Sequence, residues 1–277
     1  MSKFATYAEY PARSLTVAET ALLTAWPGLH RYHSDLVLVG GLAVKYLTKP
    51  VVGLLHGAVT MDVDFGISLA ADGGMYGSVS EDLRGQGFIR NDQGRYVREL
   101  EGLTIFIDLL TEKPSLGRGT TLVDRVPVEA FPGIQRALAT RAPKPVTGED
   151  AFGVRKEIQV PVSGIGPLLV LKINAFDVRE QPKDAYDVLL AVSNYINGPD
   201  EAIAGFRTEA SAGNSGYAQA KAALHKNFVA DGQSGPMRCA AFALGEDPGG
   251  GDVEDWASRR KQIVQQMVSV GQALLGE

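Results

Sequence analysis

The spacing of hydrophobic positions predicts a succession of helices and strands in the first part of the chain. Residues 14–26 have apolar positions at helical spacing, with Ser14 as a candidate N-cap and a stop at Pro27 and Gly28. Residues 35–41, "DLVLVGG", read as a buried strand entering a glycine turn, and "LAVKYL" reads as the helix after it. "VTMDVDFGI" then predicts a strand with alternating acidic positions.

The middle of the chain predicts further strands. "SEDLRGQGF" is typical of a short helix, and the "NDQG" turn between "FIR" and "RYVREL" indicates a hairpin. "LTIFIDLL" is the strongest β-branched run of this region. From residue 111 to about 155, frequent Gly and Pro predict loops, short strands and a small helix around "FPGIQRALA".

The second half is mainly helical by its pattern. A short strand at residues 158–162 precedes two helices that are broken near Pro182, a residue that suits the first turn of the second helix. Flexible connections at residues 209–216 and 245–255 flank further helical stretches, the last being residues 253–275. We therefore predict an α+β fold with a mixed sheet flanked by helices, followed by a mainly helical C-terminal region.

Composition narrows the class of protein. The 277 residues are 45% hydrophobic and 21% charged, which is ordinary for a globular protein and is compatible with two domains. The sequence has neither an apolar run of about 18 residues nor a secretory signal at its start, so we expect no membrane partner and a cytoplasmic location. A single cysteine, Cys239, excludes an internal disulfide, and the four histidines form no metal-ligand motif. The net charge of -5 argues against nonspecific coating of nucleic acid.

Three aspartates are the strongest chemical signal. On a strand, Asp62 and Asp64 of "MDVDF" project from one face with Cα atoms about 6.6 Å apart, so both could bind one cation. Asp108 lies inside the apolar run "TIFIDLL", where an unpaired carboxylate is costly. If the two strands are neighbours, three like charges meet, and a metal ion such as Mg²⁺ would relieve their repulsion.

Simpler interpretations stand beside this one. A lone DxD is often a solvated strand end, and Gly40 and Gly41 alone could mark only a tight turn. Asp108 could cap a helix or pair with an arginine in the core. The order of strand, Gly-Gly, helix, DxD strand and Asp strand is more specific than any of its parts.

This order, "VGG", "MDVDF", "FIDLL", resembles the nucleotidyltransferase superfamily related to DNA polymerase β. "LLVLKINAFDVREQPKDAYDVLLAV" is similar to the distal motif of the AbiEii/AbiGii toxin family of that superfamily, in which a Lys, a following Arg and a KDxxD helix recur. The resemblance spans about Leu36 to Val192. The interval from Gly41 to Asp62 is longer than usual, with "TKPVVGLLHGA" inserted.

The resemblance implies a nucleotidyltransferase-type sheet domain at residues 1–160 and a helical domain at residues 161–277 that completes the cleft for nucleoside triphosphate (NTP) and acceptor. The triphosphate would lie at Gly40 and Gly41, where a helix N-terminus favours phosphate. Asp62 and Asp64 would hold Mg²⁺, and Asp108 would bind a second metal or act as general base.

The distal motif supplies further candidates. Lys172 and Arg179 are seven positions apart on a helix and face the same way, which suits a cationic wall for phosphates, although two solvated charges would give the same spacing. Lys183 and Asp187 form an i, i+4 pair that either stabilises the helix or serves the site, with Lys183 meeting nucleotide and Asp187 orienting Lys172 or Arg179.

The function implied is transfer of a nucleoside monophosphate from NTP to a hydroxyl acceptor, with tRNA or another macromolecule as acceptor. The protein would be a bacterial toxin restrained by an antitoxin encoded beside it. The alternatives are an enzyme that modifies a small molecule such as an aminoglycoside, and a nucleotide-binding or interaction module without turnover. The absence of a Walker A lysine motif and of a Rossmann glycine fingerprint disfavours P-loop and dinucleotide enzymes.

Overall fold

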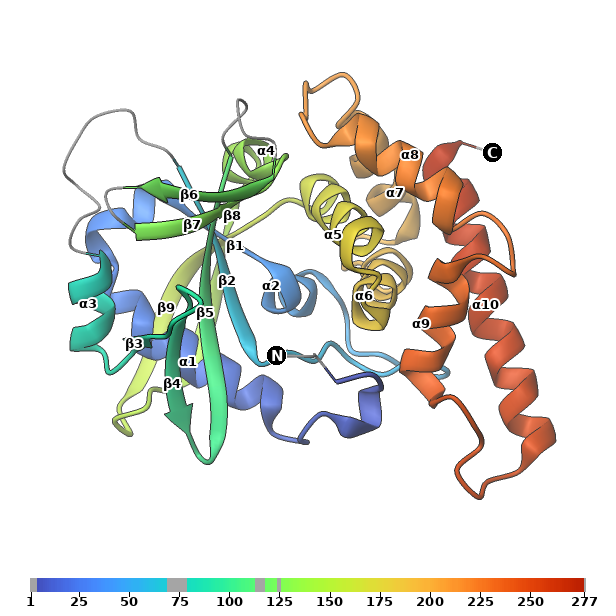
Figure 1. Cartoon of the computed structure of the whole chain (residues 1–277), viewed down its shortest axis with the longest axis horizontal. Helices are drawn as coiled ribbons and strands as arrows, with labels where there is room; N and C mark the ends of the chain where they lie inside the picture. The colour runs from blue at the N-terminus through green and yellow to red at the C-terminus, as the bar shows by residue number, and fades with distance from the viewer. Residues whose placement is uncertain (1–3, 69–78, 113–117, 124–125, 277) are drawn as a thin grey trace. The chain divides into compact units, whose positions relative to one another are not determined.

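A computed structural model shows an α+β fold, in which a mixed β-sheet is flanked by helices and followed by a mainly helical C-terminal region (Figure 1). It describes residues 4–68, 79–112, 118–123 and 126–276. The predicted fold class is therefore confirmed.

The chain packs as two units that are not continuous in sequence. The sheet unit comprises Ala12–Tyr46 and Thr60–Gly164, and the helical unit comprises Met1–Pro11, Leu47–Val59 and Ile165–Glu277. The sheet unit therefore ends four residues beyond the expected boundary at residue 160. Two segments that were expected in the first domain pack instead with the C-terminal helices.

The sheet has nine strands within the described residues, in the order β3-β4-β5-β2-β1-β9-β8, with β7 also paired to β5 and β6 paired to β7. The strands are β1 (Leu36–Val39), β2 (Asp62–Ile67), β3 (Ile89–Arg90), β4 (Tyr96–Leu100), β5 (Leu103–Thr111), β6 (Gly119–Val123), β7 (Val126–Ala130), β8 (Ala142–Glu149) and β9 (Arg155–Val162). The helices of this unit are α1 (Ser14–Gly28), a 3-10 helix (His30–Asp35), α2 (Gly40–Leu47), α3 (Val79–Gly85) and α4 (Ile134–Ala139).

The centre of the sheet combines both strand directions. β1 runs antiparallel to β2 and parallel to β9, whereas β2 runs parallel to β5. β4 returns antiparallel to β5, and β3 to β4, which confirms the predicted hairpin around "NDQG". The turn is fixed by the Asn91 side chain, whose Oδ1 accepts backbone N–H groups of Gln93 and Arg95, both at 3.0 Å.

The side chains of β2 alternate between two faces of the sheet, and a different helix covers each face. Phe65 points to the face covered by α1, where its ring lies 5.9 Å from that of Trp26. Gly66 points to the opposite face, and a Cβ at this position would lie 3.1 Å from Ile134 of α4. Asp62 and Asp64 share the face of Gly66. Both aspartates are half-buried.

Two local predictions need correction. Ser14 was expected to cap α1, but the helix already includes it, and its buried Oγ has no hydrogen-bond partner among the described residues. The described residues between 111 and 155 are more regular than the Gly and Pro content of this region indicates, since β8 pairs with β9 over its full length. Pro143 and Pro145 are tolerated in β8 because this strand forms an edge of the sheet.

The helical unit contains a short 3-10 helix (Tyr7–Glu9) and the C-terminal helices. These are α5 (Ile165–Arg179), α6 (Pro182–Ser193), α7 (Pro199–Thr208), α8 (Tyr217–Asn227), α9 (Ser234–Leu244) and α10 (Val253–Leu275). Pro182 is the first residue of α6, as predicted. Cys239 of α9 is fully buried, which agrees with a role as a small core residue, and burial raises the pKa of its thiol. None of the described helices is long and apolar enough to cross a membrane.

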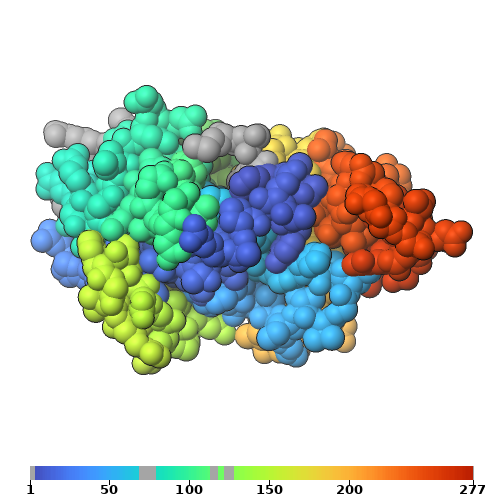
Figure 2. Space-filling model, turned by 90° about the horizontal axis from the view of Figure 1, so that it is seen from below, coloured from blue at the N-terminus to red at the C-terminus, as the bar shows by residue number. Residues whose placement is uncertain are grey.

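The inserted segment between α2 and β2 belongs to the helical unit. The backbone N–H of Lys49 donates to the carbonyl of Asn194 at 2.8 Å, and the N–H of Ile196 donates to that of Leu47 at 2.9 Å. His56 stacks on Tyr7 with ring centroids 4.4 Å apart. Residues 4–11 and 47–59 accordingly adjoin on one face of the molecule (Figure 2, dark and light blue). The extra length of this interval therefore has a structural role, because it contacts the two other parts of the helical unit.

Candidate active site

The glycine turn follows β1 directly, as the sequence predicts. Val39 ends the strand and Gly40 begins α2 with φ of 67°, a left-handed conformation that suits glycine. A Cβ on Gly40 would lie only 1.8 Å from Oδ2 of Asp64. Gly40 therefore makes room for the Asp64 carboxylate, a reason for glycine that the sequence did not reveal. Gly41 is the second residue of the same helix.

Strand register brings the three predicted aspartates together. Asp64 pairs with Val39 at the end of β1 and with Asp108 on β5. Asp62 is two residues before Asp64 on the same strand, so its side chain lies on the same face. Phe106 is opposite Asp62 and also shares that face. The hypothesis that the Asp62 and Asp108 strands are neighbours is thus confirmed.

A fourth residue, Arg95, completes the cluster and was missed at the sequence level. Its Nε donates to Oδ1 of Asp108 at 2.6 Å, and its Nη2 donates to Oδ2 of the same carboxylate at 2.6 Å. The same Nη2 donates to Oδ1 of Asp62 at 2.9 Å. The guanidinium lies 3.9 Å from the centroid of the Phe106 ring. Asp108 is therefore paired with an arginine, which is one of the interpretations left open above.

The register of β4 explains how Arg95 reaches the acids. Tyr96 pairs with Ile107, so extending the antiparallel ladder by one residue places Arg95 opposite Asp108. The signal was present in the sequence, because "RYVREL" follows the hairpin turn and precedes "LTIFIDLL". Finding it required the pairing register, which the turn between β4 and β5 sets.

The cluster shifts the acid-base properties of its members. Burial raises the pKa of Asp108 to about 6; the charges of Asp64 and Asp62 add to the rise, whereas Arg95 opposes it. Burial lowers the pKa of Arg95, but its bonds to Asp108 and Asp62 outweigh this and raise it overall. Arg95 therefore stays charged, and Asp108 takes up a proton closer to neutral pH than an ordinary aspartate does.

The donor set has the chemistry that a hard divalent cation prefers. Asp62, Asp64 and Asp108 offer only carboxylate oxygens, and the Arg95 guanidinium already stands as a cation between two of them. Among the described residues, no three acidic, histidine or cysteine side chains surround one point in the way a metal ion requires. The carboxylate oxygens are therefore the type of ligand that a divalent cation binds, but in this structure the carboxylates of Asp62 and Asp108 bind the Arg95 guanidinium.

The predicted basic residues of the distal motif lie in the helical unit and pair with acids there. Nζ of Lys172 and Nζ of Lys183 each donate to Oδ2 of Asp187 at 2.6 Å. Arg179 donates to both oxygens of Asp184, at 2.6 and 2.8 Å, and Nζ of Lys172 lies 3.5 Å from Oδ1 of Asp184. Lys172 and Arg179 thus share one face of α5, as their spacing predicts.

Burial decides the character of this cluster. The side chain of Lys172 is 8% exposed and that of Asp187 is 1% exposed, so the interpretation of Lys172 as a solvated charge is wrong. Burial alone would lower the pKa of Lys172, yet Asp187 and Asp184 raise it overall. Burial would raise the pKa of Asp187, yet Lys172 and Lys183 lower it overall. Asp187 orients Lys172, as one interpretation of the sequence proposed.

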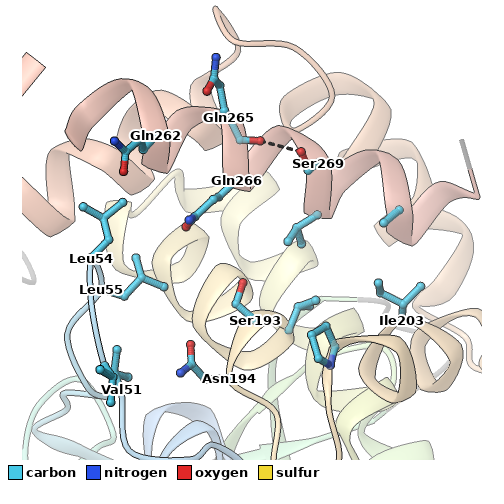
Figure 3. A pocket seen from close by; sticks show the side chains of 15 residues that line it. Val51, Leu54, Leu55, Ser193, Asn194, Ile203, Gln262, Gln265, Gln266 and Ser269 are labelled. Atoms are coloured by element: carbon cyan, nitrogen blue, oxygen red, sulfur yellow. Dashed lines mark hydrogen bonds between the residues drawn. The ribbon is translucent and has the colours of Figure 1, made fainter. Parts of the chain in front are cut away.

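The helical unit also has a cavity of about 760 Å³ (Figure 3). It is lined by the end of α6, the start of α7, α10, and Val51, Val52, Leu54 and Leu55 of the inserted segment. Gln262, Gln266 and Ser269 of α10 lie on one side and Leu54 and Leu55 on another. None of the fifteen described residues lining it is charged. The cavity therefore lacks the cationic groups that a triphosphate requires.

No family model matches this chain, and a search of curated proteins finds no match either. The resemblance to nucleotidyltransferases therefore rests on the motifs and stays a prediction.

Proposed function

We propose that the protein is a Mg²⁺-dependent nucleotidyltransferase that moves a nucleoside monophosphate from NTP to a hydroxyl acceptor and releases pyrophosphate. One observation carries the proposal. Strand pairing places Asp64 beside Asp108 and packs Asp64 against Gly40. An acid cluster at the junction of β1 and a helix N-terminus joins oxygen ligands for metal to backbone N–H groups that favour phosphate.

Phosphate binding, metal binding and proton transfer would each be carried out by different residues of the chain. The start of α2 at Gly40 and Gly41 would receive the triphosphate. Asp62 and Asp64 would hold Mg²⁺, which when bound neutralises phosphate charge and favours attack on the α-phosphorus. Asp108 would accept the proton of the acceptor hydroxyl or bind a second metal. The acceptor oxygen forms a bond to the α-phosphorus as the bond to the β-phosphate oxygen breaks, so pyrophosphate leaves.

The biological role in the proposal is that of a toxin of the AbiEii type, with tRNA or another macromolecule as the acceptor and an antitoxin as the partner. Both parts rest on the motif resemblance alone. The distal residues Lys172, Arg179, Lys183 and Asp187 stay predicted contacts or supports for nucleotide. Within α5 and α6, these residues already form ion pairs with one another and with Asp184.

A second candidate is a nucleotide-binding module without turnover. The bond network of Arg95 favours it, because a guanidinium held between Asp62 and Asp108 competes with metal for the same oxygens. The two candidates differ in whether the labelled α-phosphate of NTP is transferred to an acceptor.

The test is incubation of the full chain with each α-labelled NTP, Mg²⁺ and total tRNA, with an aminoglycoside as a parallel acceptor. We expect label on tRNA, and a loss of at least about 100-fold in Asp62→Asn and Asp64→Asn, since even outer partners of metal ligands are worth 10–100-fold. Asp231→Asn is the matched control, because Asp231 is exposed in the turn after α8. Binding of NTP without transfer of label would support the second candidate, and full activity in either variant would exclude the metal role.

A further inference from the structure

The Arg95 guanidinium occupies the centre of the acid cluster without being locked into the core. It makes three bonds to two carboxylates, two at 2.6 Å and one at 2.9 Å, yet its side chain is 26% exposed. Asp62 is 14% exposed and Asp108 26% exposed at the same bridge. Water and dissolved ions can therefore reach both partners of the guanidinium.

A divalent cation would compete with the guanidinium for carboxylate oxygens. Arg95 makes its three bonds to oxygens of Asp62 and Asp108, which are the hard ligands that such an ion prefers. Such an ion approaches carboxylate oxygens to about 2.0–2.1 Å and carries twice the charge of the guanidinium, so it competes strongly for the same oxygens.

The position of Arg95 in the chain allows its side chain to leave the carboxylates without a movement of the backbone. It directly precedes β4 and follows a turn whose shape is held by Asn91, so its backbone is fixed by local bonds and not by the aspartates. Its side chain rests on the face of Phe106 and has several rotatable bonds. The guanidinium can leave the carboxylates by side-chain rotation while the hairpin stays paired.

We propose that Arg95 is a displaceable internal cation: it holds Asp62 and Asp108 together in the metal-free protein and leaves them when a divalent cation binds. This inference rests on the proposed metal-dependent function, because it concerns the same carboxylates. It assigns Arg95 the role of setting the metal affinity of the site. Removing the guanidinium should therefore tighten metal binding, whereas a residue that merely supports the site would weaken it when removed.

The test measures metal binding directly. Mn²⁺, which accepts the oxygen ligands that suit Mg²⁺, is titrated into the full chain, and free Mn²⁺ is followed by electron paramagnetic resonance. We expect Arg95→Gln to bind Mn²⁺ at least about tenfold more tightly than the wild type. In this variant the charged bonds from Arg95 no longer compete with Mn²⁺ for the oxygens of Asp62 and Asp108. Arg90→Gln, on the neighbouring strand β3, makes the same change in net charge at an exposed position and should bind like the wild type.

Thermal stability gives a second readout. Without metal, Arg95→Gln should melt at a lower temperature than Arg90→Gln, since its three carboxylates repel one another, and Mg²⁺ should raise its melting temperature more than that of the wild type. Arg95→Lys keeps the charge but not the bidentate contact, so its Mn²⁺ affinity should lie between that of the wild type and that of Arg95→Gln. This variant keeps the test decisive if Arg95→Gln does not fold.

The outcomes of these experiments distinguish the proposed role of Arg95 from the proposed transferase function. Equal or weaker Mn²⁺ binding in both Arg95 variants would overturn the proposal, and transfer of labelled nucleotide by the wild type would then show that the proposed function survives. If none of the proteins binds Mn²⁺, the internal-cation role and the metal-dependent chemistry both fail. Tighter binding in Arg95→Gln with no transfer by any form would support the cation exchange and remove the transferase function.

Discussion

Removing Asp187 should destabilise the helical unit more than removing Lys172, although the two residues form one ion pair. Five side chains take part: Lys172, Arg179 and Lys183 are cationic, and Asp184 and Asp187 are anionic. Asp187→Ala leaves three cations and one anion. Lys172→Met leaves two of each sign and replaces the lysine by an apolar chain of similar length.

The magnitudes follow from burial and bonding. The side chain of Asp187 is 1% exposed and accepts both lysine ammonium groups, so Asp187→Ala leaves two buried charges without their main partner. Breaking such a buried network costs about 3–5 kcal/mol of unfolding free energy. In Lys172→Met, Asp187 keeps its bond to Lys183, and the loss is that of a charged hydrogen bond, about 1.5–3 kcal/mol.

Urea unfolding measures both changes. Trp256 lies in α10 and Trp26 in α1, so fluorescence in a Trp26→Phe background reports on the helical unit alone. All variants carry the same background change, which therefore cancels in the comparison. If Lys172→Met costs as much as Asp187→Ala or more, the charge-balance reasoning is wrong.

The pH dependence provides an independent check on the same pair. Lys172 and Lys183 hold the pKa of Asp187 below its ordinary value of about 3.8. The stability that this ionised carboxylate contributes is therefore present above pH of about 4 and is lost as the pH falls through the lowered pKa. The difference in unfolding free energy between wild type and Asp187→Ala should shrink over that acidic range. A constant difference down to the acid limit of folding would contradict the assignment.

Three further predictions concern other parts of the chain. Gly40→Ala should lower the unfolding free energy of the sheet unit several kcal/mol more than Gly102→Ala, because both glycines have positive φ but only the first would place a Cβ against a carboxylate; equal losses in urea unfolding would show that this contact yields freely. Asp108→Asn should keep NTP binding while slowing label transfer by orders of magnitude, and a loss confined to binding would exclude the general-base role. Tyr186→Phe removes bonds between its hydroxyl and the backbone of His56, so urea unfolding should show a loss of about 1–3 kcal/mol, whereas an unchanged midpoint would mean that the inserted segment is held by other contacts.

The burial of Lys172 also changes how any experiment on this residue should be interpreted. At the sequence level Lys172 could be treated as a phosphate contact or a solvated charge, and neither role would affect folding. Because it is buried and paired, weaker nucleotide binding in a Lys172 variant identifies a phosphate contact only if stability is unchanged under the same conditions.

Local periodicity was sufficient for the features that depend on one element. Alternation along β2 predicted that Asp62 and Asp64 share a face, and helical spacing predicted that Lys172 and Arg179 share one, which their common partner Asp184 confirms. The last helix was predicted with the bounds that the structure has, because its apolar stripe and its flanking glycines are both local signals.

Features that depend on pairing between distant segments were not predictable in the same way. The bond between Arg95 and Asp108 depends on the register of β4 against β5, and a shift of one residue would have turned Arg95 to the other face. The reason for Gly40 depends on the side chain of Asp64, which approaches from a strand 24 residues along the chain (64 minus 40). The inserted segment offered no periodic signal for its contacts with α6.

The two charged clusters differ in their access to water, and this difference favours the sheet unit as the place for a dissolved cation. Asp62 and Asp108 are 14% and 26% exposed at their bridge to Arg95, so an ion can reach them from solvent. Asp184 and Asp187, the acids paired with Lys172, are only 1–2% exposed. Burial closes the second cluster to exchange, since moving an unpaired ion into it would add a desolvation penalty of several kcal/mol. Paired acids are therefore weak evidence for a metal site by themselves, and access to solvent is what distinguishes Asp62 and Asp108 from Asp184 and Asp187.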